Sequence, residues 1–447
     1  MNPPVATTTT AATADTRFFG HPSGLATLFF TEMWERFSYY GMRAFLILYM
    51  TAPAAAGGLG FGDADATSLY GTYTGSVWGA SILGGLLADR VLGQYRSVLV
   101  GGVIIMAGHF VLAFPPVVFF YTGLALLVIG TGMLKPSVST LVGSLYEEGD
   151  ARRDAGFSIF YMGINLGALL GPLVAGYIAQ RIDWHMGFAC AGVGMFFGLL
   201  QYVLGRKKLQ SAFDRIAARP RAATGGTAPA STHHTSDWAR ISAIVVFFLF
   251  ATLFWGGYEQ AGSTLNLFAD RYTQLEMFGV SIPSSWFQSV QPIFLIAFAP
   301  LFAWLWLRMG SREPSLSAKF ALGLFFMGLS FLVLLPAAAM AQGQGIRVSP
   351  WWLILSYAIS ELGEICLGPV GLSAVTKLAP ARIVGLMMGV WFLSLSFGNK
   401  LAGWAGGFIE TMTLQSLFGI CTAVLIGAAV VMFLLVKPVS RLTGEAR

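Results

Sequence analysis

Residues 24–50, GLATLFFTEMWERFSYYGMRAFLILYM, form an apolar run that is long enough to cross a bilayer and yet contains charged side chains. About 20 apolar residues in a helix span the hydrocarbon core of a membrane. The polar positions of this run lie at offsets 0, 3, 4, 7, 8 and 11, and they are Glu32, Glu35, Arg36, Tyr39, Tyr40 and Arg43. Those offsets place them on one face of a helix. Because a charge at the bilayer centre costs about 2.5–3.5 kcal/mol, we expect this face to line a cavity or to meet another helix.

The composition of the whole chain is that of an integral membrane protein. Its 447 residues are 55% hydrophobic and only 11% charged, whereas soluble proteins are about 25% charged. The net charge of +6 does not indicate nucleic-acid binding. The basic residues lie in loops between apolar blocks, which is typical of an inner-membrane protein.

The apolar blocks predict an all-α membrane fold with twelve spans. These are 24–50, 67–89, 97–115, 118–146, 155–180, 184–205, 240–271, 284–307, 316–337, 350–377, 383–409 and 413–436. The hydrophilic segment after the sixth span, rich in Gly, Thr, Pro and Ser, predicts a flexible linker. The predicted parts of the chain are a tail 1–23, a six-helix bundle 24–205, the linker 206–239, a second six-helix bundle 240–436 and a tail 437–447.

The distribution of lysine and arginine predicts the orientation of these spans. Of the 27 such residues, 20 lie in the two tails and in the loops on the linker side, three lie in the opposite loops and four lie inside spans. Cytoplasmic loops are enriched in lysine and arginine. We therefore expect both termini to face the cytoplasm across the inner membrane.

Two six-span halves joined by a cytoplasmic linker are typical of the major facilitator fold, which binds its substrate near the midplane between the halves. The loop 85–96, GLLADRVLGQYR, resembles the cytoplasmic loop signature of that superfamily. The sequence contains no GxxxxGK[ST] phosphate loop and no HExxH motif, and its three cysteines show no CxxC spacing. We expect no metal and no cofactor, so that transport would depend on an ion gradient or on the gradient of the substrate itself.

Further charged residues occur inside the other predicted spans. Lys135 is alone in the fourth span, and its best candidate partners are Glu361 and Glu364 of the tenth span. Glu259 of the seventh span is a plausible partner for Arg43. Ionisable residues inside a membrane normally face the protein interior and mark functional sites.

The two acids of the first span are candidates for a proton site. Glu32 and Arg36 are four residues apart and can pair, whereas Glu35 is less well aimed at Arg36. Because two carboxylates share one guanidinium, one of them is available to take up a proton. A purely structural ion-pair cluster is the alternative interpretation.

Taken together, these motifs resemble the proton-dependent oligopeptide transporter (POT) family of the major facilitator superfamily, over nearly the whole chain. The run 32–41, EMWERFSYYG, matches the ExxERFxYYG motif of that family. The stretches that resemble its other motifs are 135–136, 160–167, 254–263, 363–371 and 389–392.

The resemblance implies a symporter that imports di- and tripeptides with protons by alternating access. It implies that proton coupling takes place at Glu32, Glu35 and Arg36. It also implies gating salt bridges, Lys135–Glu364 on the cytoplasmic side and Arg43–Glu259 on the opposite side. The residues expected at the peptide are Arg36, Tyr39, Tyr40, Trp78, Lys135, Asn165, Trp255, Gln291, Glu364 and Trp391.

Three pocket positions depart from the family pattern. Trp78 stands where a tyrosine is usual, Gln291 where an asparagine is usual, and Gly368 where a serine is usual. A carrier of the same fold for amino acids, peptide-like metabolites or drugs is therefore the first alternative, and an intramembrane enzyme or a sensor is a more distant one. We expect a small peptide, protons and the lipid bilayer as partners, no nucleic acid, and a monomer as the functional unit.

Overall fold

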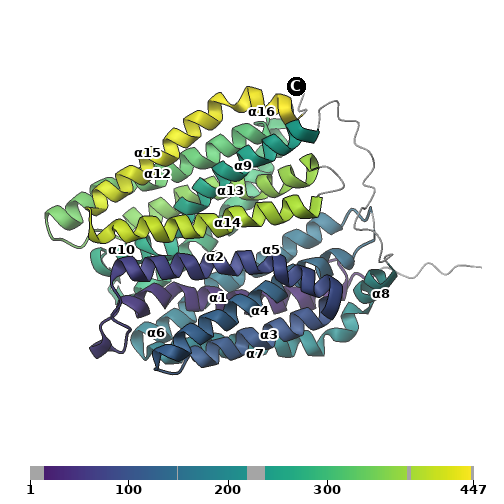
Figure 1. The fold of residues 1–447 in the computed structure, drawn as a ribbon, viewed down its shortest axis with the longest axis horizontal. Coiled ribbons are helices and arrows are strands. Elements are labelled where there is room, and N and C mark those ends of the chain that lie inside the picture. Colours follow the sequence, from purple (N-terminus) through teal and green to yellow (C-terminus); the bar gives the residue numbers. More distant parts are fainter. Residues whose placement is uncertain (1–14, 148, 219–236, 380–383, 444–447) are drawn as a thin grey trace, which may run out of the picture.

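The computed structural model describes residues 15–147, 149–218, 237–379 and 384–443, and almost all of them are helical (Figure 1). The first half consists of α1 (Ser23–Thr51), α2 (Asp63–Leu87), α3 (Gln94–Leu112), α4 (Val117–Ser144), α5 (Arg153–Gly171), α6 (Tyr177–Arg181) and α7 (Trp184–Leu204). The second half consists of α9 (Asp237–Tyr258), α10 (Thr264–Tyr272), α11 (Val290–Met309), α12 (Leu316–Gly343), α13 (Trp351–Leu378), α14 (Val384–Gly406) and α15 (Leu414–Leu434).

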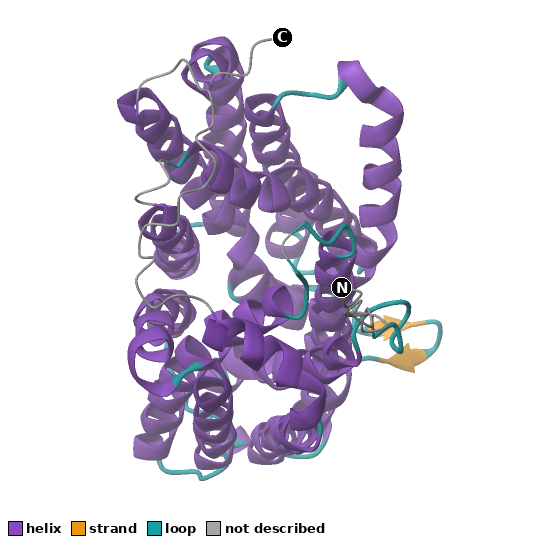
Figure 2. Ribbon diagram, turned by 90° about the vertical axis from the view of Figure 1, so that its right-hand side faces the viewer, coloured by secondary structure: helices purple, strands orange, loops and turns teal. Residues whose placement is uncertain are grey.

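Short helical turns complete these elements. They are η1 (Ala54–Ala56), η2 (Ala88–Leu92), η3 (Pro172–Gly176), η4 (Arg206–Leu209), η5 (Glu259–Gly262), η6 (Ser284–Ser289), η7 (Gly310–Arg312) and η9 (Gly407–Glu410). The turns η3 and η5 join α5 to α6 and α9 to α10, so that each pair forms one long helical segment. A small antiparallel hairpin, β1 (Glu276–Met277) with β2 (Val280–Ser281), projects from one side of the helices (Figure 2).

The twelve predicted spans are confirmed by the long helical segments of the described residues. Eight of these segments are long and apolar enough to cross a membrane. The other four are α1, α2, α13 and α14, which have 29, 25, 28 and 23 residues. Helix α1 falls short in apolar character because it carries the polar face seen in the sequence, and that face is buried. The fold is therefore all-α, with two six-helix halves.

The linker differs from the flexible segment that the sequence predicts. Residues 206–218 form η4 and α8 (Gln210–Ala218), and 219–236 lie outside the described residues. Leu209, Ala212, Phe213 and Ile216 follow helical spacing and pack against the first half. Arg215 donates to the carbonyl of Leu145 at 2.7 Å, which satisfies a free carbonyl at the end of α4. The helical spacing of these four apolar residues therefore decides the structure of 206–218, although the segment as a whole is polar.

The predicted C-terminal tail also contains structure, because α16 (Val436–Thr443) follows α15 directly. Helices α8 and α16 lie at one end of the molecule, which we call the linker end, and the turn η7 lies beside α16. Helix α10 lies at the opposite end, which we call the far end (Figure 1). The turn η5 directly precedes α10, and the turn η9 contacts the start of α2.

The two halves meet along α2 and α14 and along α5 and α11, and α2 and α14 run side by side in Figure 1. Glycines allow the first of these contacts to be close. A Cβ atom on Gly71 would lie 2.5 Å from the carbonyl oxygen of Asn399, and one on Gly403 would lie 2.6 Å from that of Thr67. Small residues at such positions let membrane helices pack backbone against backbone.

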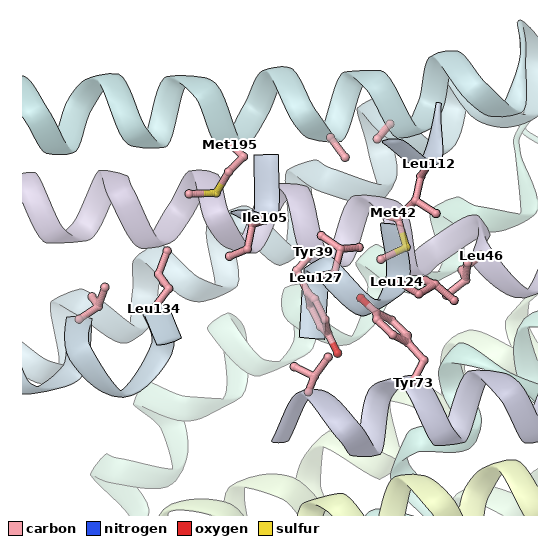
Figure 3. Packing of buried hydrophobic residues seen from close by; sticks show 14 of the residues in the cluster. Tyr39, Met42, Leu46, Tyr73, Ile105, Leu112, Leu124, Leu127, Leu134 and Met195 are labelled. Atoms are coloured by element: carbon pink, nitrogen blue, oxygen red, sulfur yellow. The ribbon is translucent and has the colours of Figure 1, made fainter. Parts of the chain in front are cut away.

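Each half has its own hydrophobic core. In the first half, Tyr39 and Met42 of α1 pack with Tyr73 of α2 and with Leu124 and Leu127 of α4 (Figure 3). Helix α1 is thus surrounded by protein along nearly its whole length. Its polar face is held inside the molecule and not at the lipid.

Candidate functional site

The polar face of α1 holds a compact ion cluster around Arg36. The Nη2 atom of Arg36 donates to Glu35 Oε1 at 2.5 Å, its Nε pairs with the other oxygen of Glu35, and Glu32 Oε1 lies 3.5 Å from Nε. All three side chains are at most 2% exposed. The guanidinium also lies over the rings of Tyr39 and Tyr40, 4.9 and 5.7 Å from their centroids. One buried cation is therefore shared by two carboxylates and two aromatic rings.

The order of the two acids differs from the prediction made from helical spacing. Glu35, the sequence neighbour of Arg36, makes the close contacts, and Glu32 makes the looser one. The long arginine side chain bends so that its planar guanidinium meets both oxygens of Glu35. The predicted Glu32–Arg36 pair is therefore formed, but the expectation that Glu35 is less well aimed at Arg36 is wrong.

Lys135 of α4 lies against an aromatic stack and not against a carboxylate. Its Nζ is 4.7 Å from the ring centroid of Trp78, and Trp78 stacks on Phe392 of α14 with centroids 6.2 Å apart and an interplanar angle of 10°. The predicted Lys135–Glu364 salt bridge is not formed within the described part of the chain. The stack joins α2 and α14, so the aromatic pair beside Lys135 contains one residue from each half.

Glu364 is held by tyrosines instead. The hydroxyl of Tyr258 lies 2.8 Å from Glu364 Oε2 and 3.1 Å from Glu361 Oε1, and the hydroxyl of Tyr161 lies 3.5 Å from Glu364 Oε1. The second oxygen of Glu361 is buried without a hydrogen-bond partner in the described residues. Neither acid of this pair has a cationic partner among the described residues, and an unpaired buried acid is costly.

At the far end, the predicted Arg43–Glu259 pair is formed across the two halves. Arg43 of α1 pairs with Glu259 of η5 and also donates to the hydroxyl of Tyr70 in α2. Both charged side chains are almost fully buried, with 10% and 6% exposed. Gly262 comes so close that a Cβ atom there would lie 3.0 Å from Arg43 Nη2.

The structure adds a second layer to this far-end contact that the sequence did not indicate. Arg271 of α10 donates two hydrogen bonds to Asp63 at the start of α2, at 2.5 and 2.7 Å. Glu410 of η9 accepts a hydrogen bond of 3.0 Å from the amide of Ala64 in the first turn of α2. An acidic group at a helix N-terminus is favourable because the amides there lack helical partners. Asp63 and Arg271 are recognisable in the sequence as charged residues, but no sequence pattern indicates that two residues 208 positions apart form a pair.

The linker end differs from the far end. A cavity of about 1090 Å³ reaches from Tyr161 and Glu364 to η7 and α16. The described residues provide no salt bridge between the halves at this end. Among the described residues, salt bridges between the halves are therefore found at the far end and not at the linker end.

Two other predicted pocket residues have their polar groups turned toward their own half. The amide of Asn165 donates to the carbonyl of Tyr161 on the same helix at 2.9 Å. Gln291 lies 3.5 Å from the hydroxyl of Ser360, which is the limit of a hydrogen bond. Both side chains are buried, and an amide carries donors and acceptors beyond the one contact given for each.

The two predicted tryptophans of the second half are buried. Trp255 packs edge to face with Tyr258, with ring centroids 5.4 Å apart, and its indole nitrogen has no hydrogen-bond partner in the described residues. Trp391 packs against Phe320. Trp255 therefore lies directly beside the tyrosine that holds Glu364.

Lys400, for which the sequence indicated no role, crosses between the halves. Its ammonium donates to the hydroxyl of Thr72 on α2, in an exposed position. Within the described residues no group of three or more His, Cys, Asp or Glu side chains is placed to hold a metal ion.

Comparison with known proteins relates this site to a transporter family. The sequence profile described as PTR2, POT family, matches residues 95–215 and 210–424. The chain is 36% identical to the peptide transporter YePEPT of Yersinia enterocolitica subsp. palearctica serotype O:3 (strain YE-P4), over 96% of this chain and 97% of that protein.

Solved structures agree with this assignment. A mutant of the peptide transporter POT in complex with alafosfalin has a TM-score of 0.86 at 40% identity, covering 96% of this chain and 97% of that one. A POT family transporter in complex with 5-aminolevulinic acid has a TM-score of 0.86 at 32% identity, covering 96% and 99%. From its sequence profile, its relatives and its fold, this chain belongs to the POT family of transporters.

Proposed function

We propose that this protein imports di- and tripeptides with protons across the inner membrane by alternating access. The observation that carries the proposal is the asymmetry of its two charged gates. Arg43 and Glu259 are paired at the far end, whereas Lys135 and Glu364 are separated at the open linker end. Because the linker side is rich in lysine and arginine, it faces the cytoplasm, and the structure is then the inward-open state.

The ends of a peptide match two groups of opposite charge in the candidate site. A peptide has one ammonium and one carboxylate, separated by its backbone. The ammonium binds to Glu364 and Glu361, which lack a cationic partner in the described residues. The carboxylate binds to Arg36 of α1 and Lys135 of α4, which are held by Glu35 and Glu32 and by Trp78 respectively.

The remaining predicted residues shape the space between these charges. Tyr39 and Tyr40 lie beneath the Arg36 guanidinium, and Trp78 lies beneath Lys135. Asn165 and Gln291 supply hydrogen-bonding amides, while Trp255 and Trp391 supply apolar walls. Aromatic walls with a few polar groups are typical of small-molecule sites.

Proton coupling arises from competition for Arg36. When the carboxylate of a peptide binds to the guanidinium of Arg36, either Glu32 or Glu35 loses some of its contact with that guanidinium. Removing one side of a buried ion pair costs about 3–5 kcal/mol, and protonation of the released acid avoids this cost. Binding of peptide and uptake of a proton are thereby linked. All of these residues belong to one chain, which supports a monomer as the functional unit.

The experiment that tests the cargo is a substrate panel in proteoliposomes with and without an inward proton gradient. We expect dialanine and trialanine, but not alanine or tetra-alanine, to inhibit uptake of a labelled dipeptide. We also expect the gradient to raise the final internal concentration of the dipeptide above the external one. Vesicles carrying the Lys135→Ala variant serve as the control, with uptake near the protein-free background. Accumulation that is independent of the gradient would contradict the proposed symport.

The departures at Trp78, Gln291 and Gly368 favour one second candidate. A carrier of peptide-like amino acids would keep the acidic and the basic group of the site, and would differ from a peptide carrier in the residues between them. The similarity to a transporter solved with 5-aminolevulinic acid supports this alternative. In the same panel, stronger competition by 5-aminolevulinic acid than by dialanine would select it.

A further inference from the structure

Helix α11 is the least covered of the apolar spans. In the most apolar stretch of the segment that contains it, Ser284–Arg312, only 11% of the residues are buried within the protein. The corresponding share is 39–56% for the other seven apolar segments of the described chain. It packs mainly against α13 and against α5 of the other half. Ile293, Ile296, Leu301, Trp304 and Leu307 on its outer side are exposed, as expected for a surface that faces lipid.

The side of α11 that faces the second half lines the 1090 Å³ cavity. Leu295, Ala299, Phe302, Ala303 and Trp306 have offsets 0, 4, 7, 8 and 11, so they form one continuous apolar face. The opposite wall comes from α12, α13 and α16. Of the lining residues, Tyr161 alone belongs to the first half, so most of the cavity is a groove within the second half and not a cleft between the halves.

The outer mouth of this groove is basic. Lys437 and Arg441 of α16 and Lys319 of α12 line it together with Glu313. Lys319 is ion-paired with Glu313, so these two charges cancel. Lys437 and Arg441 are exposed, and the described residues provide no ion pair for either. Two positive charges therefore remain at the level where α15 ends and lipid headgroups begin.

An apolar wall with a cationic rim matches one kind of molecule in a membrane. Lipid chains are the solvent at this depth, and the α11 wall of the groove, formed by alanine, leucine, phenylalanine and tryptophan, offers water few hydrogen-bond partners. Basic side chains at the cytoplasmic surface attract anionic headgroups. We propose that the groove between α11 and the α12–α13–α16 wall binds an anionic phospholipid, with an acyl chain along the α11 face and the phosphate between Lys437 and Arg441.

The inner end of the groove gives this lipid a link to the transport site. Glu364 and Tyr161, which belong to the candidate site, close the groove at its inner end. The chain of the bound lipid fills the groove beside these two residues. Any movement of α11 that narrows the groove requires the lipid to withdraw.

The test is native mass spectrometry of the delipidated full-length protein titrated with phosphatidylglycerol. The double variant Lys437→Gln/Arg441→Gln is expected to bind the first phosphatidylglycerol about 30-fold more weakly, as loss of two basic side chains at an anionic surface predicts. Its matched control is Lys207→Gln/Lys208→Gln, which removes two exposed basic residues at the linker end of the first half and is expected to leave this affinity unchanged.

A second pair of variants tests the groove itself without altering charge. Ala303→Trp fills the groove from the α11 face and is expected to abolish the tight phosphatidylglycerol site. Ala297→Trp adds the same bulk on the exposed opposite side of α11 and is expected to retain it. Thermal unfolding confirms that each variant is folded. Unchanged phosphatidylglycerol binding in both the charge variant and Ala303→Trp would overturn the proposal, and so would equal affinity for phosphatidylcholine. Because the readout is lipid binding, it is independent of the cargo.

Discussion

The ammonium of Lys135 lies 4.7 Å from the ring centroid of Trp78, while Glu364 is bound by Tyr258 and Tyr161. The gate lysine is thus held by an aromatic ring when it is not held by an acid. A cation over a tryptophan ring contributes about 0.5–2 kcal/mol, depending on its desolvation. The indole therefore offsets part of the cost of separating Lys135 from Glu364 in the open state.

Replacement of Trp78 is predicted to shift the balance between the open and closed states. In Trp78→Leu, Lys135 loses its cation–π contact with the indole. The loss of about 0.5–2 kcal/mol of stabilisation corresponds to a population shift of roughly 2- to 30-fold away from the inward-open state. Spin labels on the linker ends of α4 and α13 would report this shift as a shorter mean distance.

The conservative variant Trp78→Phe is the control, since it keeps an aromatic face for the cation. It should retain most of the open population. Equal distance distributions in the leucine and phenylalanine variants would show that the ring does not hold the lysine.

The Arg43–Glu259 pair is predicted to be essential for closing the far end. Both side chains are almost fully buried, so Arg43→Gln leaves Glu259 as an unpaired buried charge at a cost of about 3–5 kcal/mol. We expect uptake to fall by at least 100-fold, and Glu259→Gln to behave alike. The double variant Arg43→Gln/Glu259→Gln removes both charges and should recover part of the uptake. A double variant as inactive as the sum of the two single losses would argue against direct coupling.

The Asp63–Arg271 pair is predicted to matter much less, although it joins the same two halves. Its side chains are 19% and 35% exposed, and exposed pairs contribute about 0–1 kcal/mol. Asp63→Asn should therefore reduce uptake by no more than about fivefold. Rising salt should weaken this pair and leave the Arg43–Glu259 pair unaffected. A loss of uptake in Asp63→Asn as severe as that in Arg43→Gln would contradict the prediction that the Asp63–Arg271 pair contributes less than the Arg43–Glu259 pair.

The features that could be predicted from the sequence are those set by local periodicity. The offsets of Glu32, Glu35, Arg36 and Arg43 define one helix face, and the structure buries that face as expected. The twelve spans follow from apolar block length in the same way. The Arg43–Glu259 pair could also be predicted, because each charge is costly inside a membrane and requires an opposite charge nearby.

Contacts that depend on conformation or on distant elements could not be predicted. Lys135 and Glu364 are separated because the linker end is open, and a sequence does not determine which state is adopted. The Asp63–Arg271 bond and the cap of Glu410 on α2 join elements far apart in the chain. Helix α8 was missed because its apolar residues are few and lie among polar ones, although Leu209, Ala212 and Ile216 have helical spacing.

The most direct test of proton coupling at the Arg36 cluster compares two assays on the same proteoliposomes. One assay measures dipeptide accumulation driven by an inward proton gradient, and the other measures counterflow exchange of dipeptide without a gradient. For Glu32→Gln and Glu35→Gln we predict that accumulation falls to the protein-free background while counterflow persists, because the carrier still alternates but no longer takes up the coupling proton. Wild-type accumulation in both variants would contradict the account.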